Sequence, residues 1–340
     1  MAAYDPKNLE LTVDLTVPRP RLACDTPVGF LTDLAARYTP SFHLDLGNIC
    51  NLSCVYCCLE RDRLYYTTPR SALEVIDRAA TRGLKKVALV GGEPTIRKDF
   101  WQILDHLRQA GIDQVTLTTN GLMLSYPKFV ADLVRHGVTT VHLSLDAFDP
   151  GVLIELSRND SAPQLVIEAL HNLLRHPELN LFLYGVVTRA NVAHLREYVL
   201  AVRDLEVVDR PRPSVVLTGI KPAGRAWENR EDVVPPASEA AQAVAEAVRL
   251  GAEVGVNVGY KNLPPCLMRG LEGMSLDAYL QESRMDLTTG AILPPERDEF
   301  FLHGRGCARC RWQETCSGAH RNYVSLAGWG EFVPVEREGV

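Results

Sequence analysis

Residues 41–57, which read SFHLDLGNICNLSCVYC, place three cysteines directly after a short run that predicts a β-strand over Ser41–Asp45. The cysteines have a CxxxCxxC spacing, at Cys50, Cys54 and Cys57. Thiolates are the usual protein ligands of iron–sulfur clusters, normally four to a [4Fe–4S] unit, so three in one loop leave one iron without a protein ligand. An open coordination position lets a metal site bind and activate a small molecule. The alternatives on spacing alone are a zinc site, which usually takes four ligands in paired CxxC units, and a chance grouping.

Composition and charge narrow the class of protein. The chain has 340 residues, of which 46% are hydrophobic and 23% charged, as in ordinary globular proteins. The formal net charge is −6 and the basic residues are spread evenly, so no nucleic-acid partner is expected. The first twenty residues carry Asp, Glu and Pro where a secretory signal needs an apolar core, and no apolar stretch is long enough to cross a bilayer. We therefore expect a cytoplasmic protein without membrane contact, and the clustered members of its nine cysteines are expected to serve metal or redox chemistry.

Short β-branched runs alternate with amphipathic segments through the middle of the chain. Strands are predicted at Ser41–Asp45, Lys86–Leu89, Gln114–Thr118, Thr140–Leu145, Leu181–Val187 and Ser214–Gly219. Helices are predicted at Ser71–Arg82, Asp99–Ala110, Pro127–His136, Pro163–Arg175 and Val192–Arg203, with Asp99 as an N-cap. Such repeats imply parallel strands joined by long crossovers. The predicted fold class is α/β, an open, curved sheet or a partial (β/α)6 TIM-like barrel, with a small, loop-rich C-terminal extension.

The chain divides into three parts at the sequence level. Residues 1–40 form a lead-in with one helix at Val28–Tyr38, residues 41–232 form the barrel, and residues 233–340 form the extension. The extension is expected to open with a helix at Ala237–Gly251 and a strand near Glu253–Tyr260. Its remainder is rich in Pro and Gly, and a bound metal would explain how so little regular structure stays folded.

A second motif, Gly91-Gly92-Glu93-Pro94, follows the second predicted strand. The two glycines permit a close approach of backbone, and the Glu93 carboxylate can accept hydrogen bonds from the ammonium group of a bound amino acid. The same four residues alone would be more typical of a simple turn.

The two motifs together resemble the radical S-adenosylmethionine (SAM) superfamily, whose partial (β/α)6 barrel carries a three-cysteine loop after strand one and a GGE motif after strand two. The resemblance covers about residues 41–220 and includes Thr119-Asn120-Gly121, Ser144-Leu145-Asp146 and residues 187–191. It implies that SAM is bound by Tyr56, Gly91, Gly92, Glu93, Ser144, Asp146 and Arg158. Each polar contact has a simpler alternative, such as a strand cap at Ser144 or a surface residue at Arg158.

The resemblance also implies the chemistry. In the family, the vacant iron chelates the amino and carboxylate groups of SAM, and an electron from the reduced cluster cleaves the sulfonium to methionine and a 5′-deoxyadenosyl radical. The radical abstracts hydrogen from the substrate. An external electron donor of the flavodoxin or ferredoxin type is implied as a partner.

The tail holds a second cysteine group with a CxxCx5C spacing, Cys307, Cys310 and Cys316. It resembles the SPASM and twitch extensions of radical SAM enzymes, which implies one auxiliary [4Fe–4S] cluster bound by Cys266, Cys307, Cys310 and Cys316. His320 could replace Cys266 as a ligand, although a bystander role is favoured, and a structural zinc knuckle is the alternative for the whole group. Cys24 and Cys58 have no assigned role.

The sequence constrains the identity of the substrate least. Relatives with such tails modify peptides by crosslinking, thioether formation or epimerisation, or act on sugars, aminocyclitols or haem precursors. The lead-in is too short for the separate peptide-binding domain of many peptide maturases. We favour a peptide substrate over a small molecule processed by a dehydrogenase or decarboxylase. The remaining alternative is a metal-binding regulator without catalysis.

Overall fold

The computed structural model describes residues 42–59, 65–278, 284–285, 292–293 and 300–336. Ser41, the predicted helix at Val28–Tyr38 and Cys24 lie outside the described residues.

One twisted sheet forms the centre of the molecule, with its strands in the order β7-β6-β5-β4-β3-β2-β1-β8-β9. Strands β1 to β7 each pair in parallel with their neighbour in the chain. Their bounds are β1 Phe42–Asp45, β2 Lys86–Val90, β3 Gln114–Thr119, β4 Val138–Ser144, β5 Asn180–Val187, β6 Ser214–Gly219 and β7 Val258–Lys261. Strand β8 (Arg284–Met285) continues the sheet beside β1, and β9 (Ile292–Leu293) runs antiparallel to β8. The curved sheet confirms the predicted α/β partial barrel, with β7 as a parallel strand beyond the six expected.

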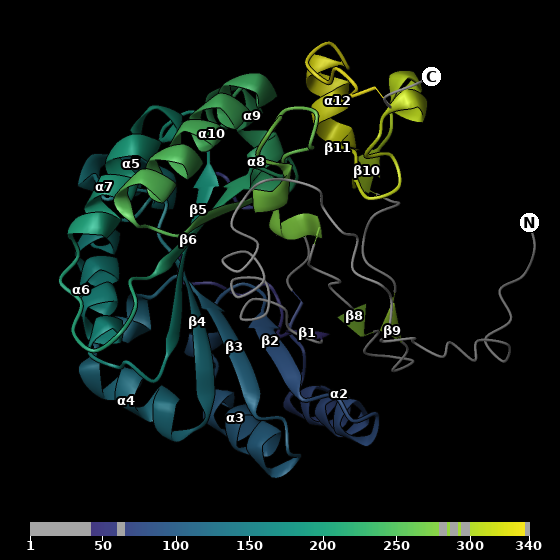
Figure 1. Cartoon of the computed structure of the whole chain (residues 1–340). Helices are drawn as coiled ribbons and strands as arrows, with labels where there is room; N and C mark the ends of the chain where they lie inside the picture. The colour runs from purple at the N-terminus through teal and green to yellow at the C-terminus, as the bar shows by residue number, and fades with distance from the viewer. Residues whose placement is uncertain (1–41, 60–64, 279–283, 286–291, 294–299, 337–340) are drawn as a thin grey trace, which may run out of the picture.

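Helices cover the outer face of this sheet, as Figure 1 shows. They are α2 Pro69–Thr81, α3 Phe100–Gln109, α4 Pro127–Arg135, α5 Pro150–Ser157, α6 Ala162–Leu174, α7 Leu195–Asp204 and α10 Ala237–Val254. Alternate strand residues such as Leu44, Leu89 and Leu117 are fully buried against them and form the main hydrophobic core. Because side chains alternate along a strand, the residues between them face the inner side of the barrel.

Three local features differ from the expectations. Asp99 is the N-cap residue of α3, as expected, but its carboxylate makes no capping hydrogen bond and is paired with Arg97 instead. Helix α10 continues to Val254, so the strand expected near 253–260 begins only at Val258. Helix α5 was not predicted: its sequence, PGVLIELS, is apolar on most sides and lacks a helical repeat of polar positions.

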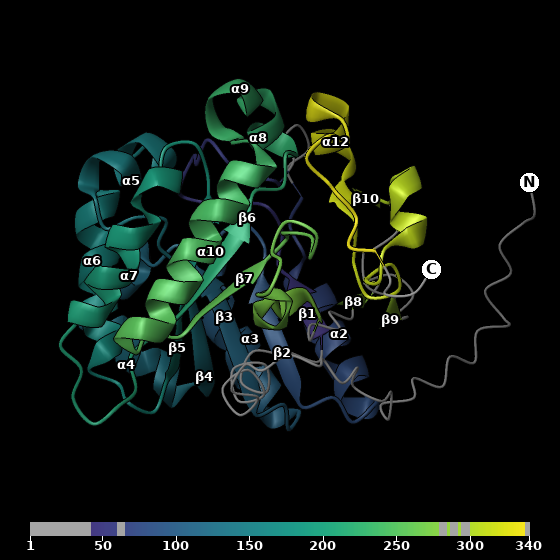
Figure 2. The same ribbon diagram turned by 45° about the horizontal axis from the view of Figure 1, so that its top comes forward.

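The C-terminal extension is small. Strands β10 (Phe301–Leu302) and β11 (Ala319–His320) form an antiparallel pair, and α12 (Arg321–Ala327) follows directly. Figure 2 shows α12 and β10 beside α8 (Gly224–Glu228), at the end of the barrel where β6 terminates. The expected boundary at residue 233 falls before α10, which packs on α7, β6 and β7. We therefore propose that the extension begins after Lys261.

Glu331 of the extension caps the N-terminus of α10. Its carboxylate accepts hydrogen bonds from the Ser238 backbone N–H at 3.0 Å and the Ser238 hydroxyl at 2.5 Å. Tyr323 donates its hydroxyl to the same carboxylate and accepts the Ala237 N–H at 2.6 Å. A carboxylate at a helix N-terminus satisfies free backbone donors and opposes the positive end of the helix dipole. The extension is thus attached to a helix of the barrel. In the described parts of the chain, no helix is both long and apolar enough to span a membrane.

Candidate cluster and cofactor site

The three-cysteine loop follows β1 and lies against the end of β2. The Gly92 N–H donates to the Gly47 carbonyl at 2.7 Å, and the Glu93 N–H donates to the Ile49 carbonyl at 2.8 Å. A Cβ atom on Gly92 would lie 2.2 Å from the Ile49 oxygen, closer than any real contact. The close approach predicted for the two glycines is therefore to the backbone that leads into Cys50, and glycine is required there.

Arg97 holds the two ends of the same loop, a role that sequence reasoning missed. Its guanidinium donates to the Leu46 carbonyl at 2.6 Å and to the Thr67 carbonyl at 2.9 Å. It also forms a bidentate pair with Asp99, at 3.0 and 2.7 Å. Arg97 is 9% exposed, so this is a buried charge whose N–H groups have acceptors. Nothing in the local sequence distinguishes it from a surface arginine.

The Glu93 carboxylate joins the ends of β2 and β3. One oxygen accepts from the Thr95 N–H at 3.1 Å, the Thr95 hydroxyl at 2.5 Å and the Thr119 hydroxyl at 2.8 Å. The other accepts the Asn120 N–H at 2.7 Å. Burial raises the pKa of Glu93, and these hydrogen bonds oppose the rise. Because an ionised carboxylate has about four acceptor sites, an ammonium group would have to share them with the chain's own donors. The expected contact with SAM stays a prediction.

The three thiols of the loop lie close together. Cys50 Sγ accepts hydrogen bonds from the Leu52 N–H at 3.4 Å and from Asn120 Nδ2 at 3.7 Å. Burial, the Asp146 carboxylate and the neighbouring thiols of Cys50 and Cys57 together raise the pKa of Cys54 to about 12. Metal binding would displace these protons, because iron takes thiolates as ligands. The donor set fits a [4Fe–4S] cluster held by three residues.

Tyr56 and Asp146, which lie 90 residues apart in the sequence, meet beside these thiols. The Tyr56 hydroxyl donates to one Asp146 oxygen, and the Val186 N–H donates to the other at 2.9 Å. Burial raises the pKa of Asp146 to about 6, and both hydrogen bonds oppose the rise. The structure thus brings together two of the predicted SAM-binding residues at the edge formed by β4 and β5.

The other two polar residues predicted to contact SAM are Ser144 and Arg158. Ser144 is half-buried at the last position of β4. Arg158 is exposed and left-handed, with φ of 55°, where α5 ends. That helix end does contact the cluster loop, since the Val55 N–H donates to the Leu156 carbonyl at 2.9 Å. Binding of SAM by Ser144 and Arg158 stays a prediction.

The second cysteine group also converges in space. A cavity in the extension is lined, among others, by Cys266, Cys307, Cys310 and Cys316. Burial and the three other thiols raise the pKa of Cys266 to about 12, and burial is the main cause that raises that of Cys316 to about 11. Within the described residues, no three His, Cys, Asp or Glu side chains are arranged to hold a single metal ion. A [4Fe–4S] cluster does not require such an arrangement, because each of its thiolates binds a different iron.

His320 does not line this cavity. Its Nδ1 accepts the Asn322 N–H at 3.3 Å and so caps α12, and its ring packs on those of Phe300 and Phe301. Burial, with the charges of Lys221 and Arg321, lowers the pKa of His320 to about 4. Cys266 therefore lies with the other three thiols and His320 does not. Cys58, next to Cys57, is exposed.

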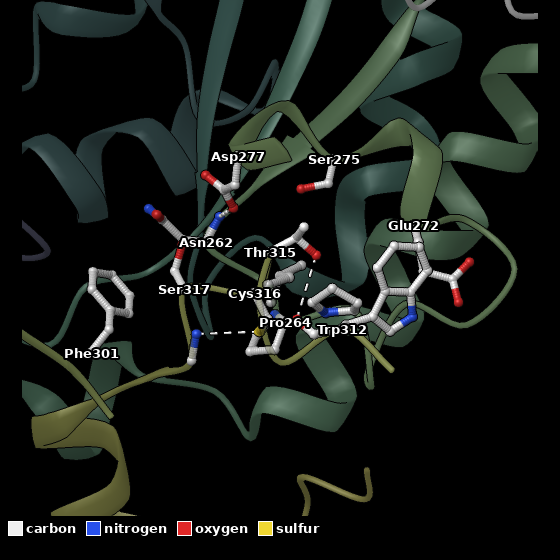
Figure 3. Close-up of a pocket in the computed structure, with 13 residues that line it drawn as sticks. Asn262, Pro264, Glu272, Ser275, Asp277, Phe301, Trp312, Thr315, Cys316 and Ser317 are labelled. Carbon is white, nitrogen blue, oxygen red and sulfur yellow. Dashed lines mark hydrogen bonds between the residues drawn. The ribbon is translucent and has the colours of Figure 1, made fainter. Parts of the chain in front are cut away.

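A second cavity adjoins the first, and Cys316 and Trp312 line both. Figure 3 shows Asp277 beside Asn262 at one end of this cavity, with Cys316 and Pro264 at its centre. The Asn262 N–H donates to the Asp277 carboxylate at 2.6 Å. Glu272, across the cavity, accepts a hydrogen bond from Arg311 at 3.2 Å. Two carboxylates thus line this cavity from opposite sides, and one of them is paired with Arg311.

The comparisons with known proteins agree with this geometry. Residues 44–199 match the family model described as the radical SAM superfamily. The chain contains a radical SAM domain. Proteins with this domain are enzymes that bind a [4Fe–4S] cluster and SAM, and the loop of Cys50, Cys54 and Cys57 would hold the cluster here.

Curated relatives match parts of this chain. It is 33% identical over 144 residues to GTP 3′,8-cyclase from Caulobacter vibrioides, which covers 40% of this chain and 41% of the relative. It is 28% identical over 239 residues to the mycofactocin maturase MftC from Mycobacterium tuberculosis, and the match covers 68% of this chain and 58% of MftC. The chain thus spans about half the length of the curated relatives it matches.

Solved structures resemble it over more of its length. The structure of Streptococcus suis SuiB bound to S-adenosylmethionine superposes with a TM-score of 0.61 at 15% identity, covering 90% of this chain and 80% of SuiB. A structure of anSMEcpe with bound AdoMet and the Cp18Cys peptide superposes with a TM-score of 0.55 at 15% identity. The match covers 82% of this chain and 88% of anSMEcpe. At these identities the likeness concerns the fold.

Proposed function

We propose that this radical SAM enzyme modifies a peptide and carries an auxiliary [4Fe–4S] cluster in its extension. The observation that carries the proposal is the convergence of Cys266, Cys307, Cys310 and Cys316 on one cavity, in addition to the three-cysteine loop. A four-thiol site of this kind suits a fully ligated cluster. The peptide assignment is supported by MftC, whose name is that of a maturase, and by SuiB, which was also solved bound to its precursor peptide SuiA.

The chain's own residues would position the reaction. When bound, the cluster and SAM supply an electron and a 5′-deoxyadenosyl radical that abstracts hydrogen. Arg97 and Gly92 fix the backbone of the loop whose three thiols would hold the cluster, so the loop would present the bound cluster in one orientation. The Tyr56–Asp146 pair would form a wall beside SAM. Fixed groups of this kind orient the reacting atoms and exclude water. The electron would come from a flavodoxin or ferredoxin.

Reductive cleavage of SAM tests the radical chemistry. Anaerobically reconstituted protein with dithionite and SAM should form 5′-deoxyadenosine, and Cys54→Ala should abolish this. Cys58→Ala is the matched control, because Cys58 is exposed and adjoins the same loop; it should keep wild-type activity. Equal product from wild type and Cys54→Ala would refute the proposal.

The substrate class needs a second assay. Candidate precursor peptides should change mass when incubated with the enzyme, SAM and reductant, or take up deuterium from D2O where the modification is an epimerisation. GTP is the comparator, because GTP 3′,8-cyclase from Caulobacter vibrioides is 33% identical to this chain over 144 residues. Conversion of GTP, with every peptide unchanged, would replace the peptide assignment by a nucleotide one while leaving the radical chemistry intact.

A further inference from the structure

Arg225 is a half-buried cation, and two of its guanidinium nitrogens have no acceptor among the described residues. It lies in α8, directly after the loop that follows β6. Its Nε and Nη2 atoms are buried and have no hydrogen-bond partner in the described parts of the chain. Arg97 shows the contrast, because each of its buried N–H groups reaches a carbonyl or carboxylate. A buried guanidinium left in this state is costly, so an acceptor supplied from outside the fold would stabilise it.

The segment that bears Arg225 packs on the cluster loop. The Ala226 N–H donates to the Cys57 carbonyl at 3.2 Å, and the Asn229 side chain donates to the Val55 carbonyl at 3.1 Å. A Cβ atom on Gly224 would lie 2.6 Å from the Leu59 oxygen. Arg225 therefore sits on backbone that is in direct contact with the loop of the three thiols.

The same segment contacts the extension. Asn322 of α12 donates its side-chain amide to the Pro222 carbonyl at 2.7 Å. Figure 2 shows α8 between the end of β6 and α12. Residues 222–229 thus lie between the two cysteine groups, where a substrate shared by both would be bound.

A second orphaned polar group occurs on the adjoining strand. The Thr218 hydroxyl of β6 is buried and lacks a hydrogen-bond partner among the described residues. Its neighbour Leu217 belongs to the core under the helices, so Thr218 faces the inner side of the barrel. Lys221 lies in the loop between β6 and α8. It adds a cation whose Nζ lies 5.9 Å from the ring centre of Phe301. The edge at β6 therefore offers positive charge and a free hydroxyl.

We propose that Arg225 binds a carboxylate at this edge, between the two cysteine groups. A guanidinium presents a planar fork that pairs with a carboxylate through two parallel hydrogen bonds. The carboxylate comes either from the methionyl end of SAM or from the substrate; the location rests on the proposed function. Arg158, the arginine expected from sequence to serve SAM, is exposed at the end of α5.

Two binding probes distinguish the sources. SAM and decarboxylated SAM are titrated by equilibrium dialysis against the oxidised, iron-loaded holoenzyme, and [1-13C]acetate is followed by relaxation enhancement near the dithionite-reduced cluster, which is paramagnetic. If SAM supplies the carboxylate, Arg225→Met weakens SAM at least tenfold and leaves decarboxylated SAM unchanged. If the substrate supplies it, SAM affinity is retained and the acetate effect is lost in Arg225→Met.

Controls keep the test decisive. Met is apolar and similar in length, so the unliganded variant should unfold at the same or higher urea concentration than wild type. Arg249→Met, at an exposed position of α10 with no part in the predicted site, is the matched control and should leave the binding of both probes unchanged. If Arg225→Met fails to load iron, Arg225→Lys keeps the charge without the fork and should still weaken one probe. Both probes binding the variant as they bind wild type would overturn the proposal. Loss of SAM cleavage in the wild type would overturn the proposed function instead, because acetate binding does not require it.

Discussion

At the scale of single residues, the buried carboxylate of Glu93 links two segments that the sequence separates. Its donors come from Thr95, Thr119 and Asn120, so it joins the turn after β2 to the end of β3. Asn120 in turn donates to Cys50 Sγ. The position of one cluster thiol therefore depends on a group that makes no contact with the metal.

Glu93→Gln should destabilise this junction. The amide nitrogen would face N–H and O–H donors, leaving buried groups unsatisfied at a cost of about 1–3 kcal/mol. Urea unfolding of wild type and variant measures the loss, and Glu239→Gln on the exposed face of α10 is the control. A variant as stable as wild type would contradict the assigned role.

His320 gives a prediction about pH. Its pKa is lowered to about 4 in the folded chain from an ordinary value near 6.5, so the unfolded chain binds more protons between these values. Folding stability contributed by neutral His320 is therefore complete above pH 6.5 and is lost as the pH falls toward 4, by at most about 3 kcal/mol.

The variant His320→Asn tests this without removing the helix cap. Asn is a good N-cap residue and does not titrate, so the difference in unfolding free energy between wild type and variant should shrink or reverse as the pH falls from 7 to 4. Comparing the two proteins cancels the loss of any acid-labile cluster. A difference that does not change with pH would show that His320 is not the titrating group.

At the scale of elements, the junction between β2 and the cluster loop has no room for a side chain at Gly92. Gly92→Ala would place a Cβ atom 2.2 Å from the Ile49 oxygen, so the loop must move away from β2. Iron per chain should fall by about half, to the roughly four irons of the auxiliary cluster. Gly330→Ala, where a Cβ atom would meet nothing within 4 Å, should keep the full content. Unchanged iron in Gly92→Ala would mean that this contact does not position the loop.

At the scale of the whole molecule, metal content distinguishes a second cluster from a zinc site. The proposal predicts about eight irons per chain, and Cys316→Ser should reduce this toward four while reductive SAM cleavage without substrate continues. Elemental analysis of iron and zinc on the same samples gives the answer. About four irons and one zinc in the wild type would assign a structural zinc knuckle to the extension.

Much of this architecture could be predicted from sequence, for identifiable reasons. The β-branched runs locate β2, β3, β5 and β6 to within a residue or two of their bounds, because strands buried on their outer face must be apolar at alternate positions. The two cysteine groups were found because thiols are rare and their spacing is distinctive. Arg97 and Arg225 could not be found in this way. Both are ordinary residues in the sequence, and burial and the presence or absence of long-range acceptors distinguish them.

The contact between Glu331 and the start of α10 bears on how electrons could travel between the two thiol groups. The rate of electron transfer depends steeply on the distance between donor and acceptor. If the extension moved relative to the barrel, this rate would vary with each movement. Here the tail is pinned to the helix that supports β6 and β7. If both thiol groups hold clusters as proposed, the distance between the clusters is therefore set by the way the barrel is built.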